Sequence, residues 1–114
     1  MHATIWHNPK CSKSRQALEL LHVRDIDVEV VKYLETHPSK EEIKTILSRL
    51  QISPRELMRT KEDLYKELGL KDEMDEEKLI DAMAEHPKLI ERPIVITEKG
   101  VVIGRPPEKI LELF

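Results

Sequence analysis

Cys11 is the only cysteine of this chain, and it lies in the segment HNPKCSKSR, residues 7–15, among four side chains that can carry positive charge: His7, Lys10, Lys13 and Arg15. A free cysteine with a pKa of about 8.5 is only ~3% ionised at pH 7. Nearby cations and the N–H groups at the start of a helix lower the pKa of a thiol, and a shift of about two units makes it mostly thiolate. The segment therefore predicts a nucleophilic thiolate at a place where an oxyanion can also bind.

Other roles for Cys11 fit the sequence less well. Free cysteines are often small buried hydrophobic residues, but the neighbours of Cys11 are Lys10 and Ser12. The segment has no glycine and no GxxxxGKS pattern, which argues against a nucleotide-binding P-loop. One cysteine and five histidines without ligand spacing predict no metal site. Outside the segment, the histidines are expected to be solvated or to cap helices: His2, His22, His37 and His86.

Three arginines stand where predicted helices and strands begin or end. Arg59 ends the segment SPRELMR, Arg92 precedes Pro93, and Arg105 precedes Pro106. The planar guanidinium group can make bidentate contact with a tetrahedral oxyanion, so the three arginines are candidates for anion binding. Each of them taken alone is more simply explained as a surface charge, and Arg55 is expected to be a solvated or structural arginine.

The spacing of apolar residues indicates which elements position these side chains. Short apolar or alternating runs bounded by turn residues predict strands at residues 3–7, 26–34, 93–97 and 101–104. Helical spacing and capping patterns predict helices at residues 12–24, from Ser39 onward, and at 53–59, 75–87 and 106–114. The expected order is therefore β-α-β, several helices, and β-β-α.

This order predicts an α/β protein with a thioredoxin-like fold. We expect a small mixed four-stranded sheet, with a helical insertion of roughly forty residues between the βαβ unit and the C-terminal hairpin and helix, all in a single domain over residues 1–114. In that fold a thiol between the first strand and the first helix occupies the reactive position. We also predict a cis Arg92–Pro93 bond at the start of the third strand, which would turn Arg92 towards Cys11.

Composition limits the partners and the compartment. The chain has 114 residues, is 39% hydrophobic and 36% charged, and carries a net charge of −3. This predicts one globular core with no general attraction to nucleic acid or membrane. The apolar runs are too short to span a bilayer, and the N-terminus does not have the pattern of a signal peptide. A single cysteine favours a reducing compartment, so we expect a cytoplasmic protein.

The chain resembles the glutaredoxin-dependent arsenate reductases. The similarity rests on the spacing His7-x3-Cys11-x3-Arg15 and on the segments that hold the three arginines, SPRELMRTKE, LIERPIVIT and GRPPEKIL. The shared segments also include YLETHPS, and they run in order along nearly the whole chain. The same family includes transcription regulators that bind RNA polymerase.

The resemblance implies a role for each of these residues. Cys11 would be the nucleophile that attacks arsenate, and Arg59, Arg92 and Arg105 would bind the oxyanion. His7 and Ser14 would tune the thiolate, while Arg15 would complete the loop motif. In the family reaction, glutathione reduces the Cys11–arsenate adduct, glutaredoxin removes the resulting mixed disulfide, and arsenite is the product. Glutathione would be a co-substrate in this arsenic detoxification, with no cofactor bound.

Two other functions are open at this point. One is a general glutathione-linked thiol oxidoreductase without the oxyanion step. The other is a non-catalytic thioredoxin-like module that binds RNA polymerase or another protein. The related regulators usually carry a CxxC pair, whereas Ser14 stands at the second position here. A resolving thiol must therefore come from another molecule, which favours glutathione and glutaredoxin.

Overall fold

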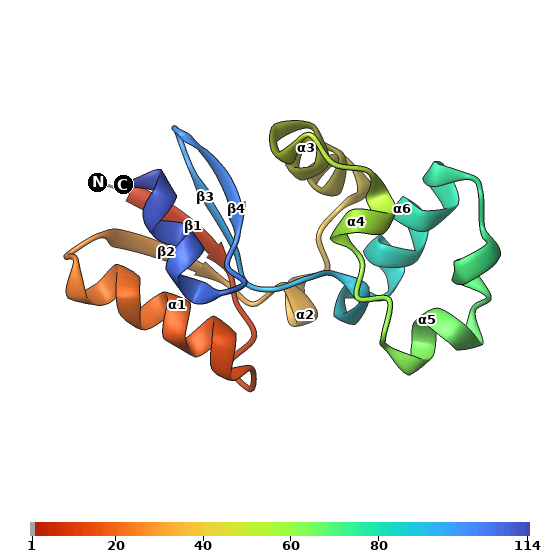
Figure 1. Ribbon diagram of the computed structural model, residues 1–114, viewed down its shortest axis with the longest axis horizontal. Helices are drawn as coiled ribbons and strands as arrows, with labels where there is room; N and C mark the ends of the chain where they lie inside the picture. The colour runs from red at the N-terminus through yellow and green to blue at the C-terminus, as the bar shows by residue number, and fades with distance from the viewer. Residues whose placement is uncertain (1) are drawn as a thin grey trace. The chain divides into compact units, whose positions relative to one another are not determined.

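The computed structural model describes residues 2–114, and this part of the chain divides into two compact units (Figure 1). The first unit comprises the residues up to Thr36 together with Arg92–Phe114, and the second is His37–Glu91. The second unit is the helical insertion, and it is longer than the roughly forty residues expected. The organisation of the chain as a single domain stays a prediction.

The first unit is built on one mixed sheet of four strands with the order β2-β1-β3-β4. The central β1 pairs in parallel with β2 and antiparallel with β3, and β3 pairs antiparallel with β4. Ile5 of β1, for example, lies opposite Val30 on one side and Val95 on the other. The strands are β1 (His2–Trp6), β2 (Asp27–Val31), β3 (Ile94–Thr97) and β4 (Gly100–Ile103).

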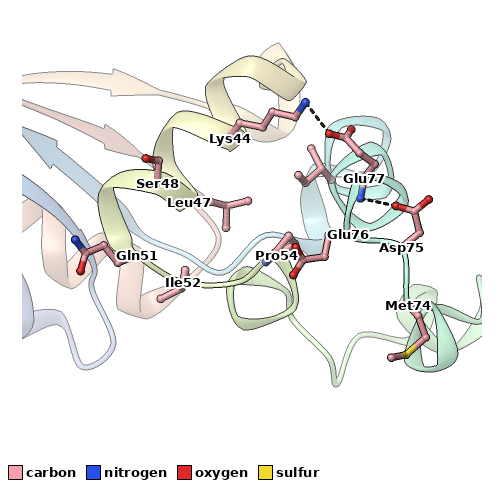
Figure 2. A pocket seen from close by; sticks show the side chains of 11 residues that line it. Lys44, Leu47, Ser48, Gln51, Ile52, Pro54, Met74, Asp75, Glu76 and Glu77 are labelled. Carbon is pink, nitrogen blue, oxygen red and sulfur yellow. Dashed lines mark hydrogen bonds and ion pairs between the residues drawn. The ribbon is translucent and has the colours of Figure 1, made fainter.

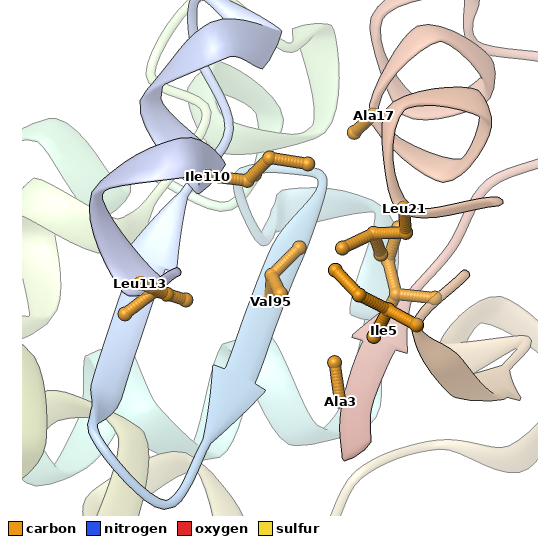
Figure 3. Close-up of a cluster of buried hydrophobic side chains, with 8 residues drawn as sticks. Ala3, Ile5, Ala17, Leu21, Val95, Ile110 and Leu113 are labelled. Carbon is orange, nitrogen blue, oxygen red and sulfur yellow. The ribbon is translucent and has the colours of Figure 1, made fainter. Parts of the chain in front are cut away.

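Two helices of this unit share a core with the sheet. Because side chains alternate along a strand, Ala3 and Ile5 of β1 face the same way. They meet Ala17 and Leu21 of α1 (Ser12–Val23), and Figure 3 shows these side chains converging with others of the cluster. The remaining members come from the loop before β2, from β3 and from η3 (Pro107–Leu113): Ile26, Val95, Ile110 and Leu113. This packing fixes α1 against β1, and so fixes the loop that joins them.

The second unit is entirely helical apart from one β-bridge between Met58 and Ile90. Ser39 begins its longest helix with a capping box, in which the Ser39 hydroxyl accepts from the Glu42 N–H and the Glu42 carboxylate accepts from the Ser39 N–H. Ser53 and Glu56 form a second capping box. The helices are α3 (Lys40–Leu50), α4 (Pro54–Leu57), α5 (Asp63–Glu67), η1 (Leu70–Asp72), α6 (Glu76–Glu85) and η2 (Pro87–Leu89).

The predicted fold class is confirmed, and four local expectations are wrong. The second strand ends at Val31, and Tyr33 begins a short helix, α2 (Tyr33–Thr36), because its ring turns inward to stack on Trp6 with centroids 6.3 Å apart. The helix predicted over 53–59 is α4, which ends at Leu57, so Arg59 lies beyond its end. Helix α5 was not predicted at all. The C-terminal helix begins at Pro107, directly after the N-cap residue Pro106, and is of the 3-10 type.

Two further features bear on the predictions. The Arg92–Pro93 peptide bond is cis, as predicted, and Arg105–Pro106 is a second cis bond that the sequence did not indicate. Over the described residues, the helices are too short or too polar for any of them to cross a membrane.

Candidate active site

Cys11 is the N-cap residue of α1, with extended backbone angles of φ −94° and ψ 123°. Its carbonyl oxygen accepts the first bond of the helix from the Arg15 N–H at 3.0 Å. No acidic residue lies in the first turn, so the positive end of the helix is not neutralised there. The side chain is partly buried and in no disulfide. The predicted position of the thiol at a helix start is therefore confirmed.

The surroundings of Cys11 favour the thiolate. Burial raises the pKa of the thiol, but hydrogen bonds from the backbone N–H groups of Ser14 and Lys13 oppose this effect. The Arg92 guanidinium adds its charge and a hydrogen bond, and together these contacts hold the pKa below its ordinary value of 9.0. The side-chain charge that acts on the thiol thus comes from the start of β3, far along the chain from the loop.

His7 and Ser14 form a buried, hydrogen-bonded pair. The Nδ1 atom of His7 and the Oγ atom of Ser14 are 2.6 Å apart, and the Asn8 N–H donates to the same Oγ at 3.1 Å. Ser14 is fully buried and His7 is 6% exposed. A buried polar atom without a partner is costly, so these mutual bonds hold both side chains in place. The structure thus joins two predicted site residues directly.

His7 does not contribute a positive charge, contrary to the expectation from the sequence. Burial lowers the pKa of His7 below 6.5, and the nearby charges of Lys32 and Arg15 lower it further. The imidazole is therefore mostly neutral at pH 7. Its contact with the site is the hydrogen bond to Ser14.

The loop between β1 and α1 is closed by bonds that the sequence analysis did not anticipate. The Asn8 carboxamide oxygen accepts from the Lys10 N–H at 3.0 Å, and the Asn8 carbonyl accepts from the Cys11 N–H at 3.0 Å. Arg15 donates through Nη1 to the Pro9 carbonyl at 2.9 Å. The Asn-Pro pair was a signal for this turn, because an Asn side chain commonly bonds the backbone two residues ahead.

Arg92 and Arg105 both lie in the first unit and contact one another. The Nε atom of Arg105 donates to the Arg92 carbonyl oxygen at 2.9 Å. The Arg92 Nε is buried and has no hydrogen-bond partner within the described chain. Behind them, the Gly104 N–H donates to the Pro93 carbonyl at 2.8 Å. An arginine with an unpaired buried N–H beside a thiol is suited to an incoming anion.

Arg59 belongs to the second unit, so its predicted convergence on Cys11 stays a prediction. Its Nη1 atom donates to Glu62 Oε2 at 2.9 Å, and its Nε atom lies 3.9 Å from Glu91 Oε1. Two carboxylates therefore hold the guanidinium. Arg55, by contrast, donates to the Tyr65 hydroxyl and to the carbonyl oxygens of Leu70 and Glu73, at the two ends of η1. It is a structural arginine, as expected.

A hollow in the second unit has neither a thiol nor an arginine among the side chains that line it. It lies between α3 and the segment that leads into α6, where Lys44 and Glu77 form an ion pair of 2.7 Å (Figure 2). The Asp75 carboxylate accepts from the Glu77 N–H at 3.0 Å. Lys44, Glu77 and Asp75 are therefore already bonded within the second unit. Within residues 2–114, no three His, Cys, Asp or Glu side chains come together in a way that could hold a metal ion.

A four-stranded mixed sheet with one thiol at the start of its first helix, and an arginine beside that thiol at the start of the third strand, defines a thioredoxin-like thiol protein. Residues 6–113 match the model of the ArsC family. The chain belongs to the ArsC family.

Individual relatives cover nearly the whole chain. An arsenate reductase of Neisseria meningitidis serogroup B is 53% identical over 108 residues, which are 93% of this chain and 92% of the relative. The uncharacterised protein YfgD of Escherichia coli K12 is also 53% identical, over 96% of this chain and 93% of its own length. The solved structure of an arsenate reductase from Vibrio cholerae superposes with a TM-score of 0.97 at 52% identity, covering 100% of this chain and 98% of that one.

Proposed function

We propose that this chain is an arsenate reductase in which the Cys11 thiolate attacks arsenate and arsenite is released. The observation that carries the proposal is the position of Cys11 at the N-terminus of α1, with the Arg92 guanidinium lowering the pKa of the thiol. The relatives named arsenate reductase, which match over almost the full chain, support the same reaction.

The first step forms a bond between sulfur and arsenic. The Cys11 thiolate attacks the As(V) centre, one As–O bond breaks, and that oxygen leaves as water after taking up protons. In the second step a glutathione thiolate attacks the Cys11 sulfur and breaks the S–As bond. The electron pair of that bond goes to arsenic, which leaves as As(III) arsenite, while the two sulfurs are oxidised to a mixed disulfide.

The third step returns the enzyme to its reduced state. A glutaredoxin thiolate attacks the glutathione sulfur of the mixed disulfide and releases the Cys11 thiolate. This chain has no second cysteine to do so itself. The requirement for free thiols fits a reducing compartment, and we place the reaction in the cytoplasm.

The charged residues have separate parts in this proposal. Arg92 pairs with the arsenate oxygens next to the attacking sulfur, and Arg105, bonded to the Arg92 carbonyl, contributes the second cation. Arg59 is expected to complete the oxyanion site. His7 and Ser14 tune the thiolate from below through their 2.6 Å contact, and Arg15 holds the loop through the Pro9 carbonyl.

The proposal is tested with purified protein, arsenate, glutathione and glutaredoxin, coupled to NADPH oxidation through glutathione reductase. Arsenate-dependent NADPH oxidation and formation of arsenite are expected with the natural chain, and neither with Cys11→Ser. Reduction of a glutathione mixed disulfide without any response to arsenate would instead assign a general thiol oxidoreductase. No activity in either assay would leave the non-catalytic binding module as the better description.

A further inference from the structure

A pocket of about 260 Å³ lies in the first unit beside the loop that carries the thiol. The loop residues 7–10 form one wall, and Lys32, Leu34 and Glu35 form the other. Sites for drug-sized ligands usually measure ~300–1,000 Å³, so this pocket has room for one end of a small peptide.

We propose that this pocket binds the γ-glutamyl end of glutathione, with Glu35 pairing with the ligand's ammonium group and Lys32 with its α-carboxylate. The choice of ligand rests on the proposed function, in which glutathione reduces the Cys11–arsenate adduct. The γ-glutamyl end is selected because it alone in glutathione carries both charges side by side.

The backbone of the second wall sets these two charges at a suitable spacing. The Glu35 N–H donates to the Lys32 carbonyl at 2.9 Å, and the Thr36 N–H donates to the same oxygen at 3.1 Å. Residues three apart on such a turn are neighbours on one face. Both side chains are exposed, and neither is held in an ion pair with another group in the described part of the chain. On this wall a zwitterionic ligand therefore meets one free charge of each sign.

The pocket and the thiol share a single short loop. Asn8 and Lys10 line the pocket, while the Asn8 carbonyl accepts a hydrogen bond from the Cys11 N–H. Consecutive Cα atoms are about 3.8 Å apart, and a tripeptide reaches roughly 10 Å when extended. A ligand anchored at Lys32 and Glu35 can therefore pass over the loop and present its central thiol to Cys11. Lys10, an exposed residue that also lines the pocket, is available to the second carboxylate of glutathione.

The charges of the pocket argue against arsenate as its occupant. A dianion gains from Lys32 and Lys10 but is repelled by Glu35, whereas an ammonium group turns the Glu35 carboxylate into a favourable contact. The two ligands of the reaction would then occupy different places, arsenate beside Arg92 and glutathione on the other side of the loop.

The test measures binding of S-methylglutathione, which cannot form a disulfide, to the reduced full-length chain by calorimetry. Glu35→Gln and Lys32→Gln are each expected to raise the Kd about three- to tenfold. This range lies between the effect of losing an exposed ion pair and that of losing a hydrogen bond to a charged group. Glu98→Gln and Lys99→Gln, exposed residues of the β3–β4 turn, are the matched controls and should keep the natural Kd. Amide NMR shifts at Asn8 and Leu34 would locate the ligand.

A second ligand separates the ammonium contact from a general charge effect. With N-acetyl-S-methylglutathione, which lacks the ammonium, Glu35→Gln should no longer weaken binding, while Lys32→Gln still should. The assignment is overturned if Glu35→Gln and Lys32→Gln bind S-methylglutathione as tightly as the controls do, or if acetylation leaves the Glu35→Gln effect in place.

The arsenate assay with the natural chain distinguishes the proposed arsenate reductase activity from the proposed glutathione pocket. Arsenite production together with unchanged Kd values in the variants would reject the pocket and retain the reductase. Weakened binding in the variants, with no arsenite produced by the natural chain, would retain the pocket as a glutathione site and reject arsenate as the substrate.

Discussion

The Arg105 guanidinium is bonded through its Nε atom to the Arg92 carbonyl oxygen at 2.9 Å. This contact joins Arg105, two residues after β4, to Arg92, two residues before β3. Arg92 in turn lowers the pKa of Cys11 through its guanidinium. The Arg92 carbonyl oxygen therefore holds Arg105, the other candidate anion-binding residue of this unit, next to Arg92.

Replacing Arg105 by lysine should impair arsenate reduction without unfolding the protein. Arg105→Lys keeps the charge but loses the planar fork and the Nε donor, and we expect kcat/KM for arsenate to fall about ten- to hundredfold, corresponding to about 1.5–3 kcal/mol. Steady-state kinetics measure this change. Arg24→Lys, at an exposed position after α1, is the control and should keep the natural kcat/KM. Equal kinetics for the two variants would remove Arg105 from the site.

The pKa of Cys11 should lie below that of a free thiol and should rise when the charge of Arg92 is removed. The N–H groups of Ser14 and Lys13 remain in Arg92→Gln, so we expect a partial rather than a complete return towards 9.0. Ultraviolet absorbance of the thiolate across pH measures the change, with Cys11→Ser as the background. A titration curve that does not move in Arg92→Gln would contradict the contact.

The same shift predicts how stability depends on pH. Folding lowers the pKa of Cys11, so folding favours the thiolate. The stabilisation is fully present above the ordinary pKa of 9.0 and is lost as the pH falls through the folded value. Reduced natural protein should therefore gain in Tm relative to Cys11→Ser as the pH is raised through this window. A difference in Tm that is constant across the window would argue that the thiol is not perturbed.

Removing the Ser14 hydroxyl should destabilise the fold. In Ser14→Ala, the buried His7 Nδ1 atom and the Asn8 N–H lose their common partner. We expect the free energy of unfolding to fall by about 1–3 kcal/mol, the cost of leaving buried polar groups unpaired. Urea denaturation measures it. Ser12→Ala, at an exposed position of the first turn of α1, is the matched control and should change stability by less than about 0.5 kcal/mol.

The two glycines of the C-terminal hairpin should respond differently to alanine. A Cβ atom at Gly104 would lie 2.9 Å from Pro93 Cγ and 3.2 Å from Ile110 Cγ2, so a ring and a core side chain would have to move. We expect Gly104→Ala to cost about 1–3 kcal/mol and to disturb Arg105 next to it. At Gly100 the nearest atom would be Leu113 Cδ2 at 3.4 Å, an ordinary contact. Thermal unfolding measures both variants. A lower Tm for Gly100→Ala than for Gly104→Ala would contradict this packing.

Much of the fold could be predicted because its signals are local. The capping box at Ser39 involves residues three apart. Two runs of β-branched residues on either side of a turn predict the hairpin between β3 and β4. Tyr33 shows where such signals fail. Its residue type favours a strand, and the neighbouring residues extend the alternating pattern, but stacking on Trp6 draws it into the short α2. Packing outweighed the local preference there.

The sequence by itself determined that one thiol would lie at the start of the first helix. The signals for this are all local: the end of a strand, the Asn-Pro turn and the helical spacing of apolar residues after Cys11. Only the tertiary structure decided which charges act on that thiol. His7 is close in sequence but becomes mostly neutral through burial and the charges of Lys32 and Arg15. Arg92 is distant in sequence, yet pairing of β1 with β3 brings it to Cys11. Charge and burial depend on distance through space, and that distance is set by the sheet.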